Sequence, residues 1–155
     1  MSAAKWDLRF LRLAQEVASW SKDPSTKVGC VIVDPDRRVV SLGFNGFPVG
    51  IEDSESRLAN RPYKLVVTLH AEENALFFAG RRMKGCTAYV THHPCGHCTA
   101  KLIQAGILRI VYIADYTFQA RWLDHMNISS ALAYEAGLTL QPYEQEDFND
   151  QQPQP

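Results

Sequence analysis

The sequence lacks an excess of positive charge. Its 155 residues include 16 Lys and Arg against 17 Asp and Glu, which gives a formal net charge of -1. A protein that follows the phosphodiester backbone of a nucleic acid depends on clustered Lys and Arg side chains. The charge balance therefore argues against a nucleic acid partner and favours a small substrate.

Long apolar runs are also missing. No stretch approaches the roughly 20 apolar residues that cross a bilayer, and the first residues show no apolar core followed by a cleavage site. We therefore expect a cytoplasmic protein with no membrane partner. In that reducing compartment the close pair Cys95 and Cys98 indicates a metal or redox pair rather than a disulfide. The other two cysteines, Cys30 and Cys86, lie in apolar runs and are interpreted as buried core residues.

Strand-like and helix-like patterns alternate along the rest of the chain. Strands of a sheet are predicted at residues 28–33, 38–44, 87–91, 109–114 and 138–143, and a shorter strand at 65–69. Helices are predicted at residues 6–21, 71–79, 95–105 and 119–136. This alternation predicts an α/β fold, a three-layer α/β/α sandwich with a five-stranded mixed sheet between helices.

Two details of the pattern predict where the core lies. The first strand has no polar residue between Cys30 and Val33, so we expect it to be buried on both faces. Residues 34–37, with the sequence Asp-Pro-Asp-Arg, predict the turn of a β-hairpin to the second strand. In the first helix, large apolar residues recur three and four positions apart and are assigned to the core. They are Trp6, Phe10, Leu13, Val17 and Trp20.

Two stretches interrupt the alternation. Residues 45–63 have no sustained period and contain several Gly and Pro, and long loops of this kind are usually functional or disordered. Residues 144–155 are acidic and rich in Gln and Pro, which predicts a tail that is disordered at its end. No internal repeat or interdomain linker is visible, so residues 1–143 are expected to form a single domain.

A candidate metal site lies in two short motifs. Cys95 and Cys98 are three residues apart at the start of a predicted helix, so their side chains leave the same face. The free backbone amides and the dipole of that helix end favour thiolates. His70 stands at the start of another predicted helix after a strand-like run. Together these three residues offer one imidazole and two thiolates, a set that suits zinc with water in the fourth position.

The fourth ligand position decides between a catalytic and a structural site. His92 and His93, on the turn before the cysteine helix, could complete a closed site, whereas His97 should point away from the two cysteines. We expect all three to be partly exposed and not to bind metal. An open site would give Glu72 a task, because a carboxylate beside metal-bound water can take up and return protons. Glu73 is expected to face solvent or to cap the helix.

At this point the sequence resembles the zinc-dependent cytidine deaminase superfamily. The resemblance is carried by His-Ala-Glu at residues 70–72 and Pro-Cys-Gly-His-Cys at residues 94–98, in which the Glu is an acid/base and not a ligand. Within the superfamily the chain is more similar to the deoxycytidylate (dCMP) deaminases, from Trp6 to about Tyr143. The stretches that resemble them are residues 23–33, 43–50, 70–75, and 98–101 with 104–107.

The resemblance implies a cytidine-deaminase-like fold and the hydrolytic deamination of dCMP to dUMP. Zinc (Zn2+) would activate the water that attacks C4 of the cytosine, and Glu72 would protonate N3 and then the leaving ammonia. It also implies a homohexamer that dCTP activates and dTTP inhibits, with Mg2+ accompanying the bound triphosphate. Some relatives hold a second, structural zinc. This chain has no histidine between Asn45 and Leu69 to bind one, so we expect one zinc per chain.

The effector site implied by the resemblance lies at Gly43, Phe44, Asn45 and Gly46. Glycines let a backbone approach a ligand closely, and Asn45 offers both a donor and an acceptor to a base. A Gly-rich turn can also simply change the chain direction. Phe44 stands where the family usually has Tyr, so it lacks the hydroxyl but can still stack.

The substrate residues implied by the resemblance begin with Tyr116, which occupies the position of a tyrosine that stacks on the pyrimidine. The alternative is an aromatic residue at a strand end that packs on the core. Loop position and donor type indicate candidates for the 5′-phosphate and the sugar. These are Ser25, Thr26 and Lys27, with Lys101 and Arg121 as further candidates.

Two rival functions remain open from the sequence. A tRNA or free-nucleoside deaminase would use the same centre, although a tRNA enzyme should show a basic face and a nucleoside enzyme needs no phosphate site. A non-catalytic zinc-containing nucleotide-binding module would not depend on Glu72 for its function.

Overall fold

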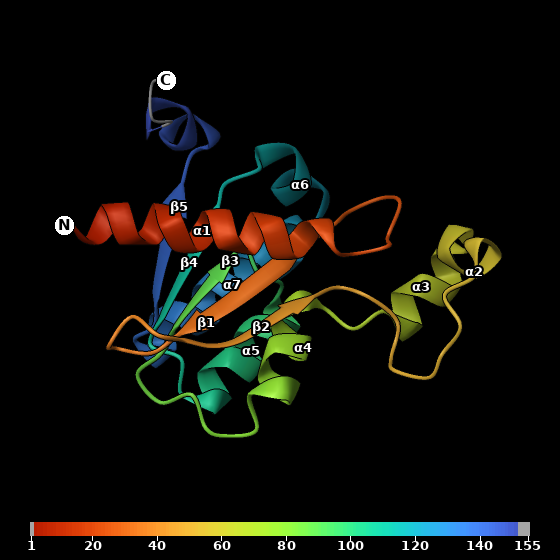
Figure 1. Ribbon diagram of the computed structural model, residues 1–155, viewed down its shortest axis with the longest axis horizontal. Coiled ribbons are helices and arrows are strands. Elements are labelled where there is room, and N and C mark those ends of the chain that lie inside the picture. The colour runs from red at the N-terminus through yellow and green to blue at the C-terminus, as the bar shows by residue number, and fades with distance from the viewer. Residues whose placement is uncertain (1, 152–155) are drawn as a thin grey trace.

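The computed structural model describes residues 2–151 and shows a five-stranded sheet between layers of helices (Figure 1). The strands are β1 Gly29–Val33, β2 Val39–Phe44, β3 Thr87–Val90, β4 Arg109–Ile113 and β5 Thr139–Tyr143, in the order β2-β1-β3-β4-β5. Strand β1 is antiparallel to β2 and β3, whereas β3, β4 and β5 run parallel. The predicted α/β/α sandwich with a mixed sheet is confirmed.

Among the described residues, seven α-helices and one 3-10 helix accompany the sheet. They are α1 Ala3–Ser19, α2 Glu55–Ala59, α3 Arg61–Val67, α4 Ala71–Ala79, α5 Gly96–Ala105, α6 Tyr116–Arg121 and α7 Leu123–Ala136, followed by a 3-10 helix, η1 Gln145–Gln151. Helix α1 lies across one face of the sheet, and α4, α5 and α7 cover the other, while α2 and α3 extend away from the sheet (Figure 1).

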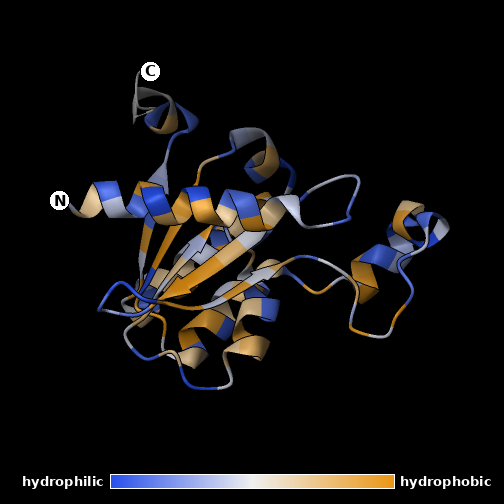
Figure 2. Ribbon diagram, in the orientation of Figure 1, coloured by the Kyte–Doolittle hydropathy of each residue, from blue (hydrophilic) through white to orange (hydrophobic). Residues whose placement is uncertain are grey.

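The first strand is buried on both faces, as predicted. Cys30 and Ile32 pack in the cluster under α4 and α5, whereas Val31 and Val33 pack in the cluster under α1. The apolar character of this strand is visible in Figure 2. Burying an apolar side chain of this size contributes about 1.5 to 3 kcal/mol. The hairpin between β1 and β2 is also present, so the core follows directly from the composition of the strands.

The aromatic stripe of α1 only partly belongs to the core. Phe10 and Val17 are buried, and Trp6 and Leu13 pack partly buried against the same cluster, but Trp20 is exposed. Trp20 is the C-cap residue of α1, where its Nε1 donates a hydrogen bond to the exposed Glu16 side chain at 3.3 Å and its ring meets Phe44 edge-on, so it lies at the rim of the core. The assignment of Trp20 to the core was therefore wrong.

The strand predicted at residues 65–69 is absent, because α3 occupies most of that stretch. The Asn60 side chain accepts a hydrogen bond from the Tyr63 amide, and Pro62 stands in the first turn of the helix. Both are start signals for a helix and outweigh the strand preference of the apolar run that follows. Only Leu69 makes a sheet-like contact, an isolated bridge to Gly46.

The helix predicted over residues 119–136 is two helices, α6 and α7. The backbone of Trp122 leaves the helical region, with φ -122 and ψ 31, and thus separates them. Helix α6 also begins earlier than predicted, with the Asp115 side chain accepting a hydrogen bond from the Phe118 amide at its start.

The acidic tail continues the fold beyond residue 143. Phe148 is buried against the α1 cluster, and its carbonyl oxygen accepts a hydrogen bond from Arg12 Nη2 at 3.2 Å. The tail was predicted at residues 144–155 with a disordered end, and its residues 152–155 lie outside the described residues. Across residues 2–151, none of the helices combines the length and the apolar character needed to span a bilayer.

Candidate metal centre

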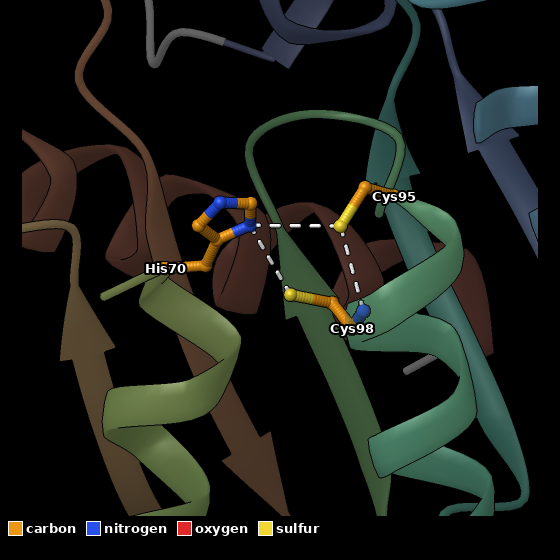
Figure 3. Close-up of side chains that lie close together, drawn as sticks. All are labelled: His70, Cys95 and Cys98. Carbon is orange, nitrogen blue, oxygen red and sulfur yellow. Dashed lines mark hydrogen bonds between the residues drawn. The ribbon is translucent and has the colours of Figure 1, made fainter. Parts of the chain in front are cut away.

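Two helix N-termini meet at one end of the sheet and carry the candidate ligands (Figure 3). His70 is the N-cap residue of α4, and Cys95 is the N-cap residue of α5, with Cys98 in the first turn of that helix. The Cys98 backbone amide donates a hydrogen bond to Cys95 Sγ at 3.4 Å. The local helix starts thus point an imidazole and two sulfur atoms into the same space.

The distances fit a tetrahedral metal ion. His70 Nδ1 lies 3.6 Å from Cys95 Sγ and 3.3 Å from Cys98 Sγ, and the three ligand atoms lie within 4.8 Å of one another. Zinc with usual Zn–N and Zn–S bond lengths separates such ligands by about 3.6 Å. His70 is exposed while Cys98 is buried, so the ligand set is open toward solvent on the histidine side. The residues present therefore fit zinc and leave room for a water molecule.

The three candidate ligand side chains shift one another's pKa values, because they lie close together. The hydrogen bond from Cys98, helped by His70, lowers the pKa of Cys95 to about 3 although burial opposes it. The same contact, together with burial, raises the pKa of Cys98. The bond to Cys95 also raises the pKa of His70 to about 9. Without metal, His70 and Cys98 thus hold protons at neutral pH, and metal binding should release them.

Glu72 stands beside the cluster in the first turn of α4 and is only 4% exposed. Burial raises the pKa of its carboxyl group, the positive charge of His70 opposes that effect, and the negative charge of Cys95 adds to it. A carboxyl group with a raised pKa gains and loses a proton more readily near neutral pH. This environment suits an acid/base catalyst.

The three other histidines of the cysteine region remain outside the cluster. His92 stacks on Phe118 with ring centroids 4.7 Å apart, and His97 is exposed. His93 is buried, contrary to the expected partial exposure, because its ring packs on Tyr112 and its Nδ1 lies 2.9 Å from the Pro94 oxygen. Within residues 2–151, the only group of three or more metal-binding side chains is His70, Cys95 and Cys98.

A cavity of about 590 Å³ opens at the carboxyl ends of β3 and β4, and both Lys27 and Tyr116 line it. Tyr116 is 66% exposed, and its hydroxyl donates a 2.6 Å hydrogen bond to Glu144. Ser25 and Thr26 do not line this cavity but lie on the loop that leads to Lys27.

The stretch predicted to bind an effector makes many internal contacts. A side chain at Gly43 would lie 2.4 Å from the Ala71 carbonyl oxygen, so glycine permits close packing of β2 on α4. Both groups of the Asn45 amide are bonded, the oxygen to the Val28 amide at 2.8 Å and the nitrogen to the Thr26 carbonyl oxygen at 2.9 Å. These contacts connect the stretch to α4 and to the loop before β1. An effector role for it stays a prediction.

Lys101 and Arg121, the two further phosphate candidates, each contact another side chain, and their phosphate role stays a prediction. Lys101 pairs with Glu73, and Glu73 in turn accepts a 2.8 Å hydrogen bond from the His70 amide. Glu73 therefore caps the helix, one of its two expected roles, and also links α4 to α5. The signal for the cap was in the sequence, since Glu three residues after an N-cap is typical of a capping box. Arg121 lies over the Phe118 ring.

Comparisons with known proteins agree with this site. The family model of the cytidine and deoxycytidylate deaminase zinc-binding region matches residues 4–114. An Aliivibrio fischeri protein named "Uncharacterized deaminase in luxG 3'region" is 47% identical over 139 residues, covering 88% of this chain and 92% of the relative. The Homo sapiens deoxycytidylate deaminase is 32% identical over 149 residues, covering 90% of this chain and 80% of the relative.

A similar solved structure is the crystal structure of dCMP deaminase from the cyanophage S-TIM5 in complex with dCMP and dUMP. It matches with a TM-score of 0.72 at 24% identity and covers 92% of this chain and 99% of the other. At that level of identity the likeness establishes the fold.

Proposed function

The chain belongs to the cytidine and deoxycytidylate deaminase family, and from that membership we propose that it deaminates dCMP to dUMP and ammonia. The observation that carries the proposal is the open triad His70, Cys95 and Cys98 with buried Glu72 beside it. The choice of dCMP is supported by relatives that are named deoxycytidylate deaminases at 32% to 39% identity.

The chemistry needs one metal ion and one proton carrier. When bound by His70, Cys95 and Cys98, zinc would supply a Lewis acid that makes a water molecule nucleophilic near neutral pH. Glu72 takes one proton from the water and delivers it to N3 of the cytosine, while the water oxygen forms a bond to C4. Glu72 then takes the remaining hydroxyl proton and passes it to the amino group, so that the bond between C4 and nitrogen breaks and ammonia leaves. The sum is cytosine plus water giving uracil plus ammonia.

The substrate is held on the cavity side of the sheet. We assign the stacking on the pyrimidine to Tyr116 and the contacts to the 5′-phosphate and sugar to Ser25, Thr26 and Lys27. The cavity that Tyr116 and Lys27 share supports this assignment. Asp115, Glu144 and Glu146 also line the cavity and disfavour a phosphate, so the assignment depends on Lys27, the one Lys or Arg among the lining residues. The three zinc-ligand candidates and Glu72 are not among those lining residues.

Regulation by nucleotides is the finer part of the proposal. Activation by dCTP and inhibition by dTTP, with Mg2+ on the triphosphate, would act through Gly43, Phe44, Asn45 and Gly46. The contacts of this stretch support such a path. The Asn74 side chain donates to the Phe44 carbonyl oxygen at 2.7 Å, and Gly46 pairs with Leu69, the residue before His70. A shift of the stretch would therefore reach the start of α4.

A homohexamer in the cytoplasm completes the proposal. Large apolar side chains are exposed on the helices around the metal centre, including Phe77 and Phe78 on α4 and Ile128 on α7. Contacts between copies of the chain would cover them, since exposed apolar patches commonly mark interaction sites.

The test is a deamination assay with dCMP, CMP, deoxycytidine and an RNA hairpin, each with and without dCTP and dTTP. We expect turnover of dCMP, faster with dCTP and slower with dTTP. Activity on deoxycytidine or on the hairpin without activity on dCMP would replace the proposal with one of the rival deaminases. If dCMP is deaminated at the same rate with and without dCTP and dTTP, only the regulatory part of the proposal is contradicted.

A further inference from the structure

The loop that carries the proposed phosphate contacts, residues 21–28, is held in place by Asn45, the residue that follows β2. The Asn45 amide binds the backbone of Thr26 and Val28, and the Ser21 hydroxyl donates to the Asn45 carbonyl oxygen at 2.9 Å. We call residues 21–28 the substrate loop. These bonds fix the two ends of the loop but leave its middle, Pro24 and Ser25, without a contact to Asn45.

The middle of the substrate loop is organised by Asp23. Its Oδ1 accepts hydrogen bonds from the amides of Ser25 at 2.8 Å and Thr26 at 3.3 Å. The same oxygen accepts from Lys64 Nζ at 2.8 Å, and Lys64 also lies 3.4 Å from the Ser25 hydroxyl. The side chains of this ion pair are only 13% and 9% exposed. Asp23 thus orders two amides of the loop while Lys64 neutralises its charge.

Lys64 comes from a part of the chain that is otherwise remote from the sheet. It lies on α3, which extends away from the body of the molecule (Figure 1), six positions before the zinc ligand His70. Between the two residues, the backbone of Leu69 is bonded to Gly46 in both directions, at 2.9 and 3.1 Å. Lys64 therefore joins the substrate loop to the segment that enters the metal centre.

We propose that Lys64 is a positioning residue for the substrate, which sets the shape and the charge of the substrate loop through Asp23. The inference rests on the proposed function, because it takes Ser25, Thr26 and Lys27 as the phosphate contacts. Without Lys64 the carboxylate of Asp23 stands unpaired beside the loop and repels a phosphate dianion. With Lys64 in place that charge is cancelled and the loop amides keep their orientation.

The pKa of Asp23 is consistent with this arrangement. Burial alone would raise it, but the Lys64 hydrogen bond and the two backbone amides outweigh burial and hold the pKa below its ordinary value. Asp23 is thus ionised at neutral pH, so that its charge matters to a nearby phosphate.

The chain offers a matched control in the pair formed by Lys22 and Asp53. It joins the substrate loop to the segment before α2 at 2.8 Å, but its side chains are 71% and 41% exposed. Exposed pairs contribute little because water screens them. Lys22→Met therefore removes a lysine and an ion pair near the same loop while leaving the buried pair intact.

The experiment measures dCMP deamination and zinc content in Lys64→Met, Lys64→Arg and Lys22→Met. Lys64→Met should raise the KM for dCMP about tenfold and change kcat less than about twofold, because the loss affects substrate binding and not proton transfer. Its zinc content should equal that of the unmodified protein. Lys64→Arg should restore most of the KM, and Lys22→Met should leave it unchanged.

A second variant distinguishes the effect of the Asp23 charge from the effect of a disordered loop. In Asp23→Asn/Lys64→Met the unpaired carboxylate is gone while an amide oxygen can still accept from Ser25, so the KM should return toward the original value. An unchanged KM in Lys64→Met, or equal effects of Lys64→Met and Lys22→Met, would overturn the inference.

Hydrogen exchange tests whether Lys64 orders the substrate loop, and it does so without relying on the proposed reaction. Amides of residues 23–27 should exchange faster in Lys64→Met than in the unmodified protein and in Lys22→Met. If the unmodified protein does not deaminate dCMP, the proposed function fails on its own account. In that event unaltered exchange in Lys64→Met also overturns the role of Lys64, and faster exchange supports it.

Discussion

Asp7 and Glu72 are the two least exposed carboxylates among the described residues, and their surroundings differ. Asp7 on α1 is 3% exposed and accepts four hydrogen bonds, two from Arg109 at 2.6 and 2.8 Å and one each from Tyr89 and Tyr143 at 2.8 and 2.9 Å. These bonds outweigh burial, so that the pKa of Asp7 lies below its ordinary value. For Glu72, contacts with Cys98 and its own backbone amide do not offset burial, and its pKa is raised.

We infer from the difference that Asp7 stabilises the fold and that Glu72 serves the proposed reaction. A buried carboxylate with enough donors remains ionised and joins the elements that supply those donors, here α1 with β3, β4 and β5. A buried carboxylate with too few donors has a raised pKa, so it can bind and release a proton during a reaction. The comparison therefore predicts opposite results when each carboxylate is replaced by its amide.

The largest effect should follow from Glu72→Gln. The amide cannot take up and return protons, so we expect kcat to fall by about a thousandfold or more, in line with the loss of a general acid/base. Zinc content and the urea midpoint should be retained, because Glu72 is not one of the three ligands.

The matched control for that variant is His70→Ala, which should lose both zinc and activity. A Glu72→Gln protein that keeps every function would instead indicate a non-catalytic zinc module. Normal zinc content in His70→Ala would contradict the ligand set.

The next effect should follow from Asp7→Asn and concern stability. The change leaves the Arg109 guanidinium without its carboxylate, and breaking a buried pair of this kind costs about 3 kcal/mol. Activity per folded molecule should be unchanged. Urea unfolding measures the loss, and Asp53→Asn, in an exposed pair, should cost far less. Equal losses in the two variants would show that the four bonds of Asp7 add nothing.

A smaller, pH-dependent effect follows from the lowered pKa of Asp7. A carboxyl group whose pKa is lower in the folded state stabilises the protein above its unfolded pKa, here 3.8, and loses that contribution as the pH falls through the folded value. The difference in unfolding free energy between the unmodified protein and Asp7→Asn should therefore be constant near neutral pH and shrink below 3.8. Taking the difference removes the effect of zinc release, which both proteins share. A difference that grows on acidification would contradict the assignment.

The two carboxylates also differ in how far the sequence predicts them. Glu72 was identifiable because each half of its site is local, with His70 and Glu72 at one helix start and Cys95 and Cys98 at another. Asp7 was not, since its partners Tyr89, Arg109 and Tyr143 lie 82, 102 and 136 residues away. No short pattern encodes such contacts.

The same reason explains the other outcomes. The five strands of the sheet and the burial of β1 on both faces follow from local apolar patterns and were predicted. The pairing of Lys64 with Asp23, 41 residues apart, required the path of α3, and that path was predicted wrongly because the apolar run after Lys64 favours a strand. Local patterns thus predict the centre of the site better than the loops that surround it.

Glu144, unlike Asp7 and Glu72, is a carboxylate in solvent, and we expect the smallest effect when its hydrogen bond is removed. It is exposed and accepts one hydrogen bond, from Tyr116 at the rim of the cavity. A single exposed bond contributes little, so Tyr116→Phe should raise the KM for dCMP only about two- to threefold, because the ring proposed to stack on the base remains. Glu144→Gln should have the same small effect or none, whereas Tyr116→Ala, which removes the ring, should exceed both. If Tyr116→Phe lowered activity as much as Tyr116→Ala, the hydroxyl would be the working part of the side chain, and Glu144 would resemble Asp7 in holding its partner in place.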